Sequence, residues 1–205
     1  MANNQKDKNT EQLILQAARK VFIEKGLAGA RMQDIADRAG FNKALLHYYF
    51  TSKAKLFDLV FEREFGIFFA NLGTILSSEL PLFEKIKNVV ALDIERMTQL
   101  PGLPNFMLNE ISRNPDVILK RLKKIPMEKV LSVFQKQIND EIKKGTVKKI
   151  NANQLLMNIQ SLCVFPFIAR PMIKGLMQMD EKTYQAMIQK RKTEVADFII
   201  SAIKI

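Results

Sequence analysis

The chain has 205 residues, of which 47% are apolar and 26% are charged, so a packed globular core is well within its reach. Its 32 lysines and arginines outnumber 21 acidic residues, and the net charge of +11 fits either a polyanionic partner such as nucleic acid or a protein that is simply basic. The single cysteine, Cys163, excludes an internal disulfide and fits a reducing compartment. Because it lies in the apolar run SLCVF, we interpret it as a buried, inert thiol.

The sequence predicts no contact with a membrane. The polar start, MANNQKDKNT, lacks the apolar segment of a signal peptide. The longest uncharged run, residues 150–169, is long enough to span a bilayer but is rich in side chains that hydrocarbon would leave without hydrogen bonds. These are Asn151, Asn153, Gln154, Asn158, Gln160 and Ser161. We therefore expect a soluble, cytoplasmic protein.

Apolar residues recur at helical spacing, and neither alternating strands nor hairpin turns are evident, which predicts an all-α fold of about nine helices. The first helix should begin with Asn9 or Thr10 as N-cap and end before Gly26. A second, short helix over residues 32–39 should end at Gly40, where a positive φ is useful. The apolar stripe of the first helix is predicted to be Leu13, Ile14, Ala17, Ala18, Val21 and Phe22.

Asn42 should cap a third helix over residues 43–50, and Ser52 a longer fourth one. The fourth helix is predicted to bury Leu56, Leu59, Val60, Phe61, Phe65 and Phe68. Prolines and glycines divide the rest of the chain into further helices. These are predicted over residues 81–99 and 105–113, briefly after Asn114-Pro115, from Pro126 to before Gly145, from Asn151 with interruptions near Pro166 and Pro171, and from Asp180 as N-cap almost to Ile205.

The linker Gly40-Phe41-Asn42 joins the second and third helices as in a helix-turn-helix, whose second helix is presented to the major groove of DNA. The small Ala36 should let the two helices cross closely, while Phe41 and Leu46 plug the angle between them. No acidic residue lies from position 38 to position 57. Because phosphate contacts supply most nucleic-acid affinity, such an interval suits a contact face. Its basic residues are Arg38, Lys43, Lys53 and Lys55.

The motif GFNKALLHYYFTSKAKLF (40–57), preceded by AARKVFIEKG (17–26) and MQDIADRAG (32–40), resembles the DNA-binding domain of TetR-family transcriptional repressors. The resemblance covers about residues 10–60. The sequence departs from the family's pattern at three positions. Asn42 replaces the usual Ser and preserves capping, Leu45 replaces Thr or Asn and loses a hydrogen-bonding base reader, and His47 stands where the family usually has Tyr.

Within the third helix, Leu46 and Phe50 are predicted to face inward. The remaining candidates are called the predicted DNA face: Arg31, Asn42, Lys43, Ala44, Leu45, His47, Tyr48, Tyr49 and Lys53. The resemblance implies that both tyrosines contact phosphates or base edges, that Lys53 anchors a phosphate, and that Arg31 touches the backbone of the neighbouring strand. Leu45 suits apolar contact with a thymine methyl. Two alternatives stay open, because Tyr49 also fits a partly buried role and His47 a surface position with no partner.

Catalytic patterns are weak in this sequence. His47 and Cys163 are the only histidine and the only cysteine, so neither a zinc cluster nor a Cys-His pair is well supported. There is no glycine-rich phosphate loop, and no carboxylates pair beyond helical surface spacing. We therefore predict no enzyme activity, no cofactor and no metal site. An enzyme would need a polar, carboxylate-lined cleft instead.

The remaining helices are rich in phenylalanine and methionine, which usually form ordinary core. The TetR resemblance also implies a ligand cavity between roughly the fourth and eighth helices, and Met and Phe adapt to irregular ligands. The pocket candidates are Phe68, Met97, Phe106, Met107 and Phe134, with Asn105, Glu110 and Arg170 as weaker polar candidates. The effector itself is not identified by these residues.

The last two helices carry broad apolar faces, which a single intramolecular core would also explain. The resemblance implies instead a four-helix bundle between two chains, as recognition of palindromic DNA requires. The dimer candidates are Met157, Val164, Phe167, Ile168, Tyr184, Met187, Ile188, Val195 and Phe198, with Leu162, Ile199 and Ala202 beside them. We divide the chain into a helix-turn-helix domain, residues 1–52, and a larger helical effector-binding and dimerisation domain, residues 53–205.

Together these patterns predict a homodimeric repressor of double-stranded, palindromic operator DNA with half-sites roughly 34–36 Å apart or somewhat more. A small apolar or amphipathic effector would move the fourth helix and release the operator, with a coupling of about 1–3 kcal/mol. The alternative is a helix-turn-helix DNA-binding or protein-interaction module with no small-molecule effector. Activation in place of repression is also compatible with these residues.

Overall fold

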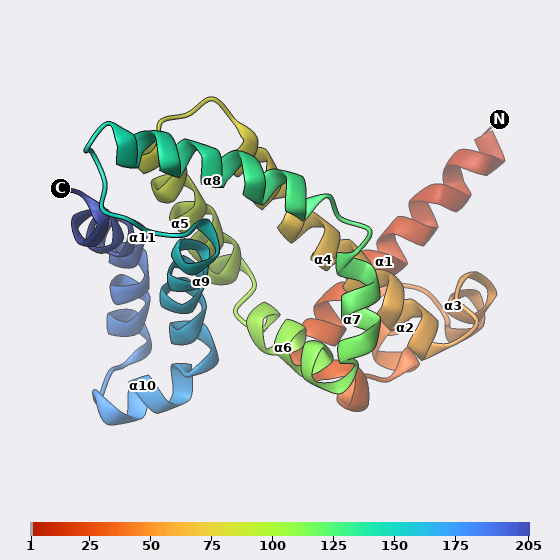
Figure 1. Cartoon of the computed structure of the whole chain (residues 1–205). Helices are drawn as coiled ribbons and strands as arrows, with labels where there is room; N and C mark the ends of the chain where they lie inside the picture. Colours follow the sequence, from red (N-terminus) through yellow and green to blue (C-terminus); the bar gives the residue numbers. More distant parts are fainter. Residues whose placement is uncertain (1) are drawn as a thin grey trace. The chain divides into compact units, whose positions relative to one another are not determined.

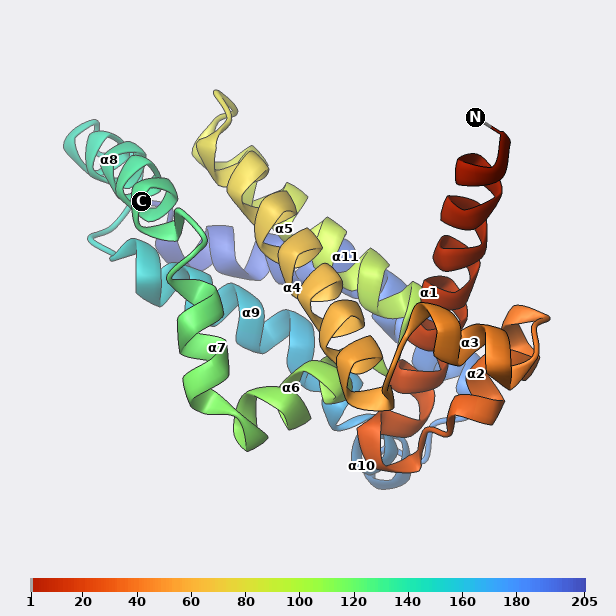
Figure 2. The same cartoon turned by 90° about the vertical axis from the view of Figure 1, so that its right-hand side faces the viewer.

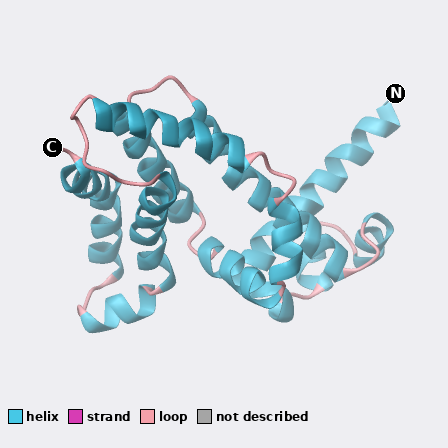
Figure 3. Ribbon diagram, viewed as in Figure 1, coloured by secondary structure: helices cyan, strands magenta, loops and turns pink. Residues whose placement is uncertain are grey.

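The computed structural model describes the backbone of residues 2–205 and the side chains of residue 7 and of residues 9–205. Its described elements are α-helices joined by short loops (Figure 3), and the predicted all-α class is confirmed. The helices are α1 (Ala2–Gly29), α2 (Met32–Ala39), α3 (Lys43–Tyr49), α4 (Lys53–Ser77), α5 (Leu82–Gln99), α6 (Leu103–Arg113), α7 (Pro115–Leu122), α8 (Met127–Lys143), α9 (Ala152–Ile168), α10 (Arg170–Leu176) and α11 (Glu181–Ile203) (Figure 1).

These eleven helices exceed the predicted number of about nine. The short helix predicted after Asn114-Pro115 is α7, and the interruption predicted near Pro171 makes α10 a separate helix with proline in its first turn. The chain divides into two compact units. The N-terminal unit ends at Phe68 and also takes in residues 105–110, and the C-terminal unit comprises residues 69–104 and 111–205. The boundary between them falls inside α4.

In the N-terminal unit, α2 packs against both α1 and α3, and the three lie together in both views (Figure 1 and Figure 2). Helix α1 begins at Ala2, so the predicted start at Asn9 or Thr10 was wrong. The helix was predicted to end before Gly26, but α1 continues to Gly29 after a kink at Gly26, which has the non-helical values φ 66° and ψ 178°. Glycine is favoured there because a side chain would strain this left-handed conformation.

The core of the N-terminal unit is an aromatic cluster. The ring centroids of Phe22 and Phe57 are 5.1 Å apart in an edge-to-face arrangement. Phe106 lies 5.3 Å from Phe57 and 5.8 Å from Phe61. Two residues of the predicted apolar stripes are not buried, since Leu13 is 41% exposed and Leu59 is 46% exposed. Each stands one residue, or about 100° of helix, from a buried neighbour.

In the C-terminal unit, α5 packs against α9 and α11, while α8 and α10 pack against α9. The N-caps predicted for α9 and α11 are confirmed. The Asn151 side chain accepts a hydrogen bond from the backbone N–H of Asn153 at 2.8 Å, and Asp180 accepts one from Thr183 at 2.7 Å.

Within the described chain no single helix is long and apolar enough to cross a bilayer. Helices α9 and α10 together meet that test by length and composition, with a 72° bend between them.

The interior of the C-terminal unit holds a carboxyl and the thiol. Asp93 on α5 is 8% exposed and accepts a hydrogen bond from the Gln160 amide at 2.6 Å. Burial raises the pKa of Asp93 to about 6, against the opposing effects of Gln160 and Arg96. Cys163 is 1% exposed, and burial raises the pKa of its thiol to about 12. The predicted burial of this cysteine is confirmed, and a thiol with this pKa is a poor nucleophile at neutral pH.

Replacing Asp93 with asparagine is expected to stabilise the protein at pH 7 and not at pH 4. Between about pH 4 and pH 6 the unfolded chain has lost this proton while the folded chain retains it, so the carboxyl lowers the free energy of unfolding as pH rises. At about 1.4 kcal/mol per pKa unit, the penalty reaches roughly 3 kcal/mol above pH 6. Asparagine keeps an oxygen that can accept from Gln160 and carries no charge.

Urea denaturation of wild type and Asp93→Asn across pH 4 to 8 tests this expectation. The exposed Asp197→Asn variant on α11 is the control, because it makes the same chemical change outside the core. A stability difference between wild type and Asp93→Asn that stays constant with pH would contradict the expected titration.

Candidate nucleic-acid interface

The turn between α2 and α3 is built as the sequence predicts. Ile35 and Ala36 of α2 are buried, and Gly40 ends the helix with φ 75°. The backbone N–H of Gly40 donates to the Asp37 carbonyl at 3.2 Å, and that of Phe41 donates to the Ala36 carbonyl at 3.0 Å. The turn is therefore closed by backbone hydrogen bonds at the end of α2.

Helix α3 is capped and fastened by a few residues. The Asn42 side chain accepts a hydrogen bond from the backbone N–H of Leu45 at 2.8 Å, which confirms the predicted cap. Leu46 is fully buried and Phe50, at the end of the helix, is 5% exposed, so both inward-facing predictions are confirmed. Since Leu46 is the only buried residue within α3, it anchors the helix to the rest of the unit.

Most of the predicted DNA face is open to solvent. Arg31, at the N-cap of α2, is exposed, and so are Asn42, Lys43, Ala44 and His47. Tyr48 is 78% exposed, which is unusual for a large ring and leaves its whole face available for stacking or hydrogen bonding. Leu45, Tyr49 and Lys53 are half-buried.

The two tyrosines form a pair at the end of α3, with ring centroids 5.3 Å apart and planes at 90°. The Tyr49 hydroxyl donates a hydrogen bond to Asp7 Oδ1 at 2.6 Å, across 42 positions of sequence. This hydrogen bond is the main cause of a raised pKa of Tyr49. Asp7 was not among the predicted site residues, because a helix beginning at Asn9 or Thr10 would have left it outside α1.

Two of the four basic residues in the acid-free interval have partners within the unit. Lys53 Nζ donates to the backbone carbonyl of Ala30 at 2.9 Å, and Arg38 pairs with Glu24 at 2.7 Å. Both cations retain further N–H donors, since an ammonium has three and a guanidinium five. Lys43 and Lys55 are exposed.

The five pocket candidates are distributed over both units. Phe106 belongs to the aromatic cluster of the N-terminal unit and is 4% exposed, while Phe68 and Met107 there are half-buried. In the C-terminal unit, Met97 is 7% exposed and Phe134 is fully buried.

The polar pocket candidates also divide between the units. In the N-terminal unit, Asn105 is exposed and Glu110 is buried. In the C-terminal unit, Arg170 forms an ion pair with Glu181 and lies 5.2 Å above the Tyr184 ring. This arginine is therefore engaged at the corner between α10 and α11.

The dimer candidates separate into two groups within the C-terminal unit. Four of them lie in the chain's own core: Phe167, Tyr184, Ile188 and Val195. The Tyr184 hydroxyl, for example, donates to the Pro166 carbonyl at 3.0 Å. Val164, Ile168 and Met187 are half-buried, whereas Met157 is 61% exposed and Phe198 is 67% exposed.

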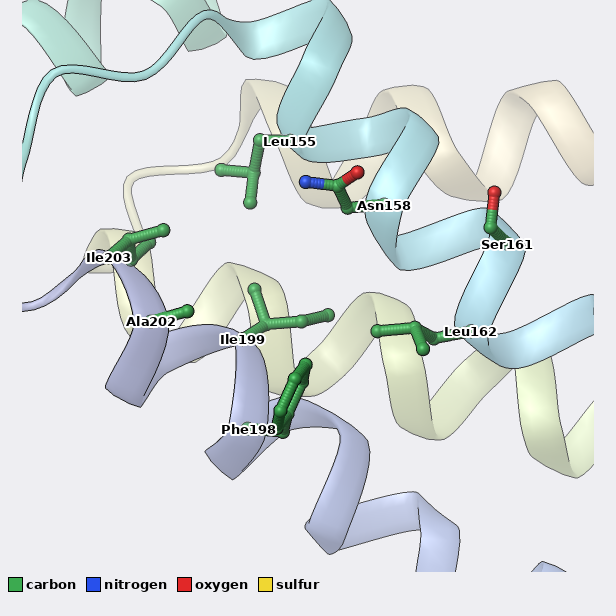
Figure 4. A pocket seen from close by; sticks show the side chains of 8 residues that line it. All are labelled: Leu155, Asn158, Ser161, Leu162, Phe198, Ile199, Ala202 and Ile203. Atoms are coloured by element: carbon green, nitrogen blue, oxygen red, sulfur yellow. The ribbon is translucent and has the colours of Figure 1, made fainter.

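An apolar groove of about 310 Å³ lies between α9 and α11. Figure 4 shows the side chains that line it, with Leu162 of α9 and Phe198 and Ile199 of α11 among them. Leu155, Ile199 and Ile203 are buried beneath it, while Asn158, Ser161 and Ala202 are exposed at its rim. The groove is therefore open to solvent and apolar at its base.

Residues 14–60 match the family model for bacterial regulatory proteins of the tetR family. Over 58 residues the chain is 41% identical to the HTH-type transcriptional activator FasR of Mycolicibacterium smegmatis, covering 28% of this chain and 26% of that protein. Over 59 residues it is 42% identical to the HTH-type transcriptional repressor NicS of Pseudomonas putida, covering 29% and 28%. The solved structure of the ketosteroid transcriptional regulator KstR2 of Mycobacterium tuberculosis is similar with a TM-score of 0.66 and 18% identity, covering 95% of each chain.

These comparisons bear on different parts of the chain. The family match includes the whole of α2 and α3, and therefore the turn and the exposed helix described above. The chain spans only about a quarter of the length of FasR and NicS. The structural likeness extends over nearly the whole chain, and at 18% identity it shows the shared fold alone.

Proposed function

We propose that the chain is a ligand-responsive transcriptional repressor of the TetR family of bacterial regulatory proteins, whose family model matches residues 14–60. It binds double-stranded operator DNA as a homodimer and is released by a small apolar or amphipathic effector. Two observations support the proposal. Helix α3 lies within the residues that match the family model, and the chain has the fold of a solved TetR-family regulator.

The observation that carries the proposal is that α3 is exposed to solvent and follows a turn closed by backbone hydrogen bonds. Lys43, Ala44 and Tyr48 face solvent, while Leu46 is fully buried and holds the helix in place. A helix fixed on one side and open on the other can enter the major groove without rearranging its own core. A buried structural helix would not leave Tyr48 78% exposed.

Within this proposal five residues of the predicted DNA face have chemical roles. Lys43, near the N-terminus of α3, supplies a positive charge where free backbone N–H groups also favour phosphate. Tyr48 and Tyr49 donate to phosphates or base edges, and Leu45 contacts a thymine methyl. Lys53 can contact a phosphate with a second N–H while one remains on the Ala30 carbonyl.

Dimerisation is proposed through the exposed apolar part of α9 and α11. Met157 and Phe198 are large apolar side chains more than half exposed, and Phe165 is 54% exposed. Covering them with the same face of a second copy would satisfy two-fold symmetry and present two copies of α3 to two half-sites. The four buried candidates would then support this surface from behind.

The effector proposal is based on the phenylalanine and methionine side chains of α4 to α8. Helix α4 contains residues of both units. An effector that moved this helix would therefore alter the N-terminal unit directly, with a coupling of about 1–3 kcal/mol. We propose repression because occupying a promoter is sufficient for it, whereas activation also needs a surface for the transcription machinery.

Binding of random-sequence duplex DNA across a salt series tests the DNA face without knowledge of the operator. Lys43→Ala/Tyr48→Ala is expected to weaken binding more than tenfold at low salt. Removing one ionic phosphate interaction should flatten the dependence of log K on log salt by about 0.9 per protomer. Fluorescence anisotropy of labelled duplex provides the measurement.

Lys124→Ala is the matched control, because it removes one positive charge from an exposed site in the C-terminal unit. It should change binding less than twofold. Equal affinity and equal salt dependence for wild type and Lys43→Ala/Tyr48→Ala would place the DNA contact elsewhere and would reject the proposed face.

A further inference from the structure

The first turns of α1 bring a carboxylate to the end of α3. Asp7 is exposed, and its Oδ1 accepts a hydrogen bond from the Tyr49 hydroxyl at 2.6 Å. The Tyr49 ring in turn packs edge-to-face against the exposed Tyr48 ring. Asp7 is thus an acidic side chain in direct contact with a residue proposed to bind a negatively charged backbone.

A phenol has a single hydroxyl proton to donate. While Asp7 holds that proton, Tyr49 has no hydrogen-bond donor left for a phosphate oxygen. The carboxylate also places a negative charge within one hydrogen bond of the site where the phosphate would sit, and the two like charges repel. Hydrogen bonds to ionised acceptors are short and strong, as the 2.6 Å distance illustrates, so this contact competes effectively with a phosphate.

We propose that Asp7 is an intramolecular competitor of the DNA phosphate for the Tyr49 hydroxyl, and that it reduces the sequence-independent part of DNA affinity. In the free protein the Asp7 carboxylate occupies the hydroxyl, and on DNA a phosphate displaces it. The proposed contact of Leu45 with a thymine methyl is unaffected by this exchange, so Asp7 increases its relative weight in binding. This inference rests on the proposed DNA-binding function.

Two substitutions at Asp7 separate its charge from its hydrogen bond. Asp7→Asn removes the charge and keeps an oxygen that can accept from Tyr49, whereas Asp7→Ala removes both. We expect Asp7→Asn to tighten binding of random-sequence duplex about two- to threefold at low salt, and Asp7→Ala about five- to tenfold. Both substitutions remove the same negative charge, so both should steepen the slope of log K against log salt by a similar amount, because the slope reports charged contacts and a neutral hydroxyl adds none.

Tyr49→Phe decides whether Asp7 acts through the hydroxyl. In the Tyr49→Phe background, Asp7→Ala and Asp7→Asn should give the same small gain, because only the charge remains to be removed. If Asp7→Ala gives its full five- to tenfold gain in that background, the carboxylate acts through space and the proposed competition is rejected. If Asp7→Ala leaves wild-type affinity and salt slope unchanged, Asp7 plays no part in DNA binding.

The full-length protein is used throughout, and Glu128→Gln is the matched control. It makes the same change in net charge at an exposed position of the C-terminal unit, and its binding should stay within twofold of wild type. Absence of duplex binding by wild type and all variants would reject the proposed function. Strong wild-type binding that Asp7→Ala leaves unchanged would reject only this inference.

Discussion

Replacing Leu46 with alanine is expected to lower the free energy of unfolding of the N-terminal unit by about 2–5 kcal/mol and to abolish measurable DNA binding. Helix α3 has seven residues, too few to be stable alone in water. Leu46 is fully buried and is the only buried residue within it. Without this side chain the helix retains only its Asn42 cap, the buried Phe50 at its end and the hydrogen bond from Tyr49.

Urea denaturation followed by circular dichroism measures the decrease in stability, and anisotropy of labelled duplex measures binding. Leu59→Ala is the matched control, since it removes the same atoms from a leucine that is 46% exposed on α4. A surface substitution of this kind should cost about 0.5 kcal/mol or less. Retention of both wild-type stability and wild-type DNA affinity by Leu46→Ala would show that α3 is held by other contacts.

Features set by neighbouring residues could be read from the sequence. The positive φ of Gly40, the Asn42 cap and the Asp180 cap all depend on backbone groups within a few positions, so local residue types were sufficient to predict them. The burial of Leu46 and Phe50 followed from helical spacing combined with the short linker.

Contacts between distant segments could not be read in the same way. Lys53 bonds the Ala30 carbonyl 23 positions away, and Tyr49 bonds Asp7 at a separation of 42. Neither pair has a sequence signal, because one depends on where the loop after α1 lies and the other on where the start of α1 lies beside the later helices. The charge count of the acid-free interval therefore overlooked the partners of Arg38 and Lys53 within the unit and the acidic side chain that contacts Tyr49.

The two apolar faces of α11 illustrate a related limit. Tyr184 and Ile188 pack into the chain's own core, whereas Phe198 is 67% exposed. A helix that is apolar on more than one side gives no sequence signal for which side meets its own chain and which could meet a second copy. Only the position of α5 and α9 around α11 separates the two.

Arg19 and Glu64 form an ion pair whose carboxylate is buried, and breaking this pair is expected to destabilise the N-terminal unit. Arg19 on α1 donates to both carboxylate oxygens of Glu64 on α4, at 2.5 and 3.1 Å. The Glu64 side chain is 1% exposed and that of Arg19 is 32% exposed. Arg19→Met would leave a buried carboxylate without its guanidinium, which should lower the free energy of unfolding by about 3 kcal/mol, toward the lower end of the range for buried pairs because Arg19 is partly solvated.

The charge itself, not the change in packing, is expected to cause most of this destabilisation. In the double variant Arg19→Met/Glu64→Leu no buried charge remains, and apolar replacements of buried pairs are often neutral. The double variant should therefore recover most of the stability in urea denaturation. Lys25→Met, which breaks the more exposed pair with Asp34 at 2.7 Å, should cost less than about 1 kcal/mol. If Arg19→Met and the double variant are equally destabilised, the interaction between α1 and α4 at this point depends on side-chain packing, and the buried carboxylate needs no guanidinium to be tolerated.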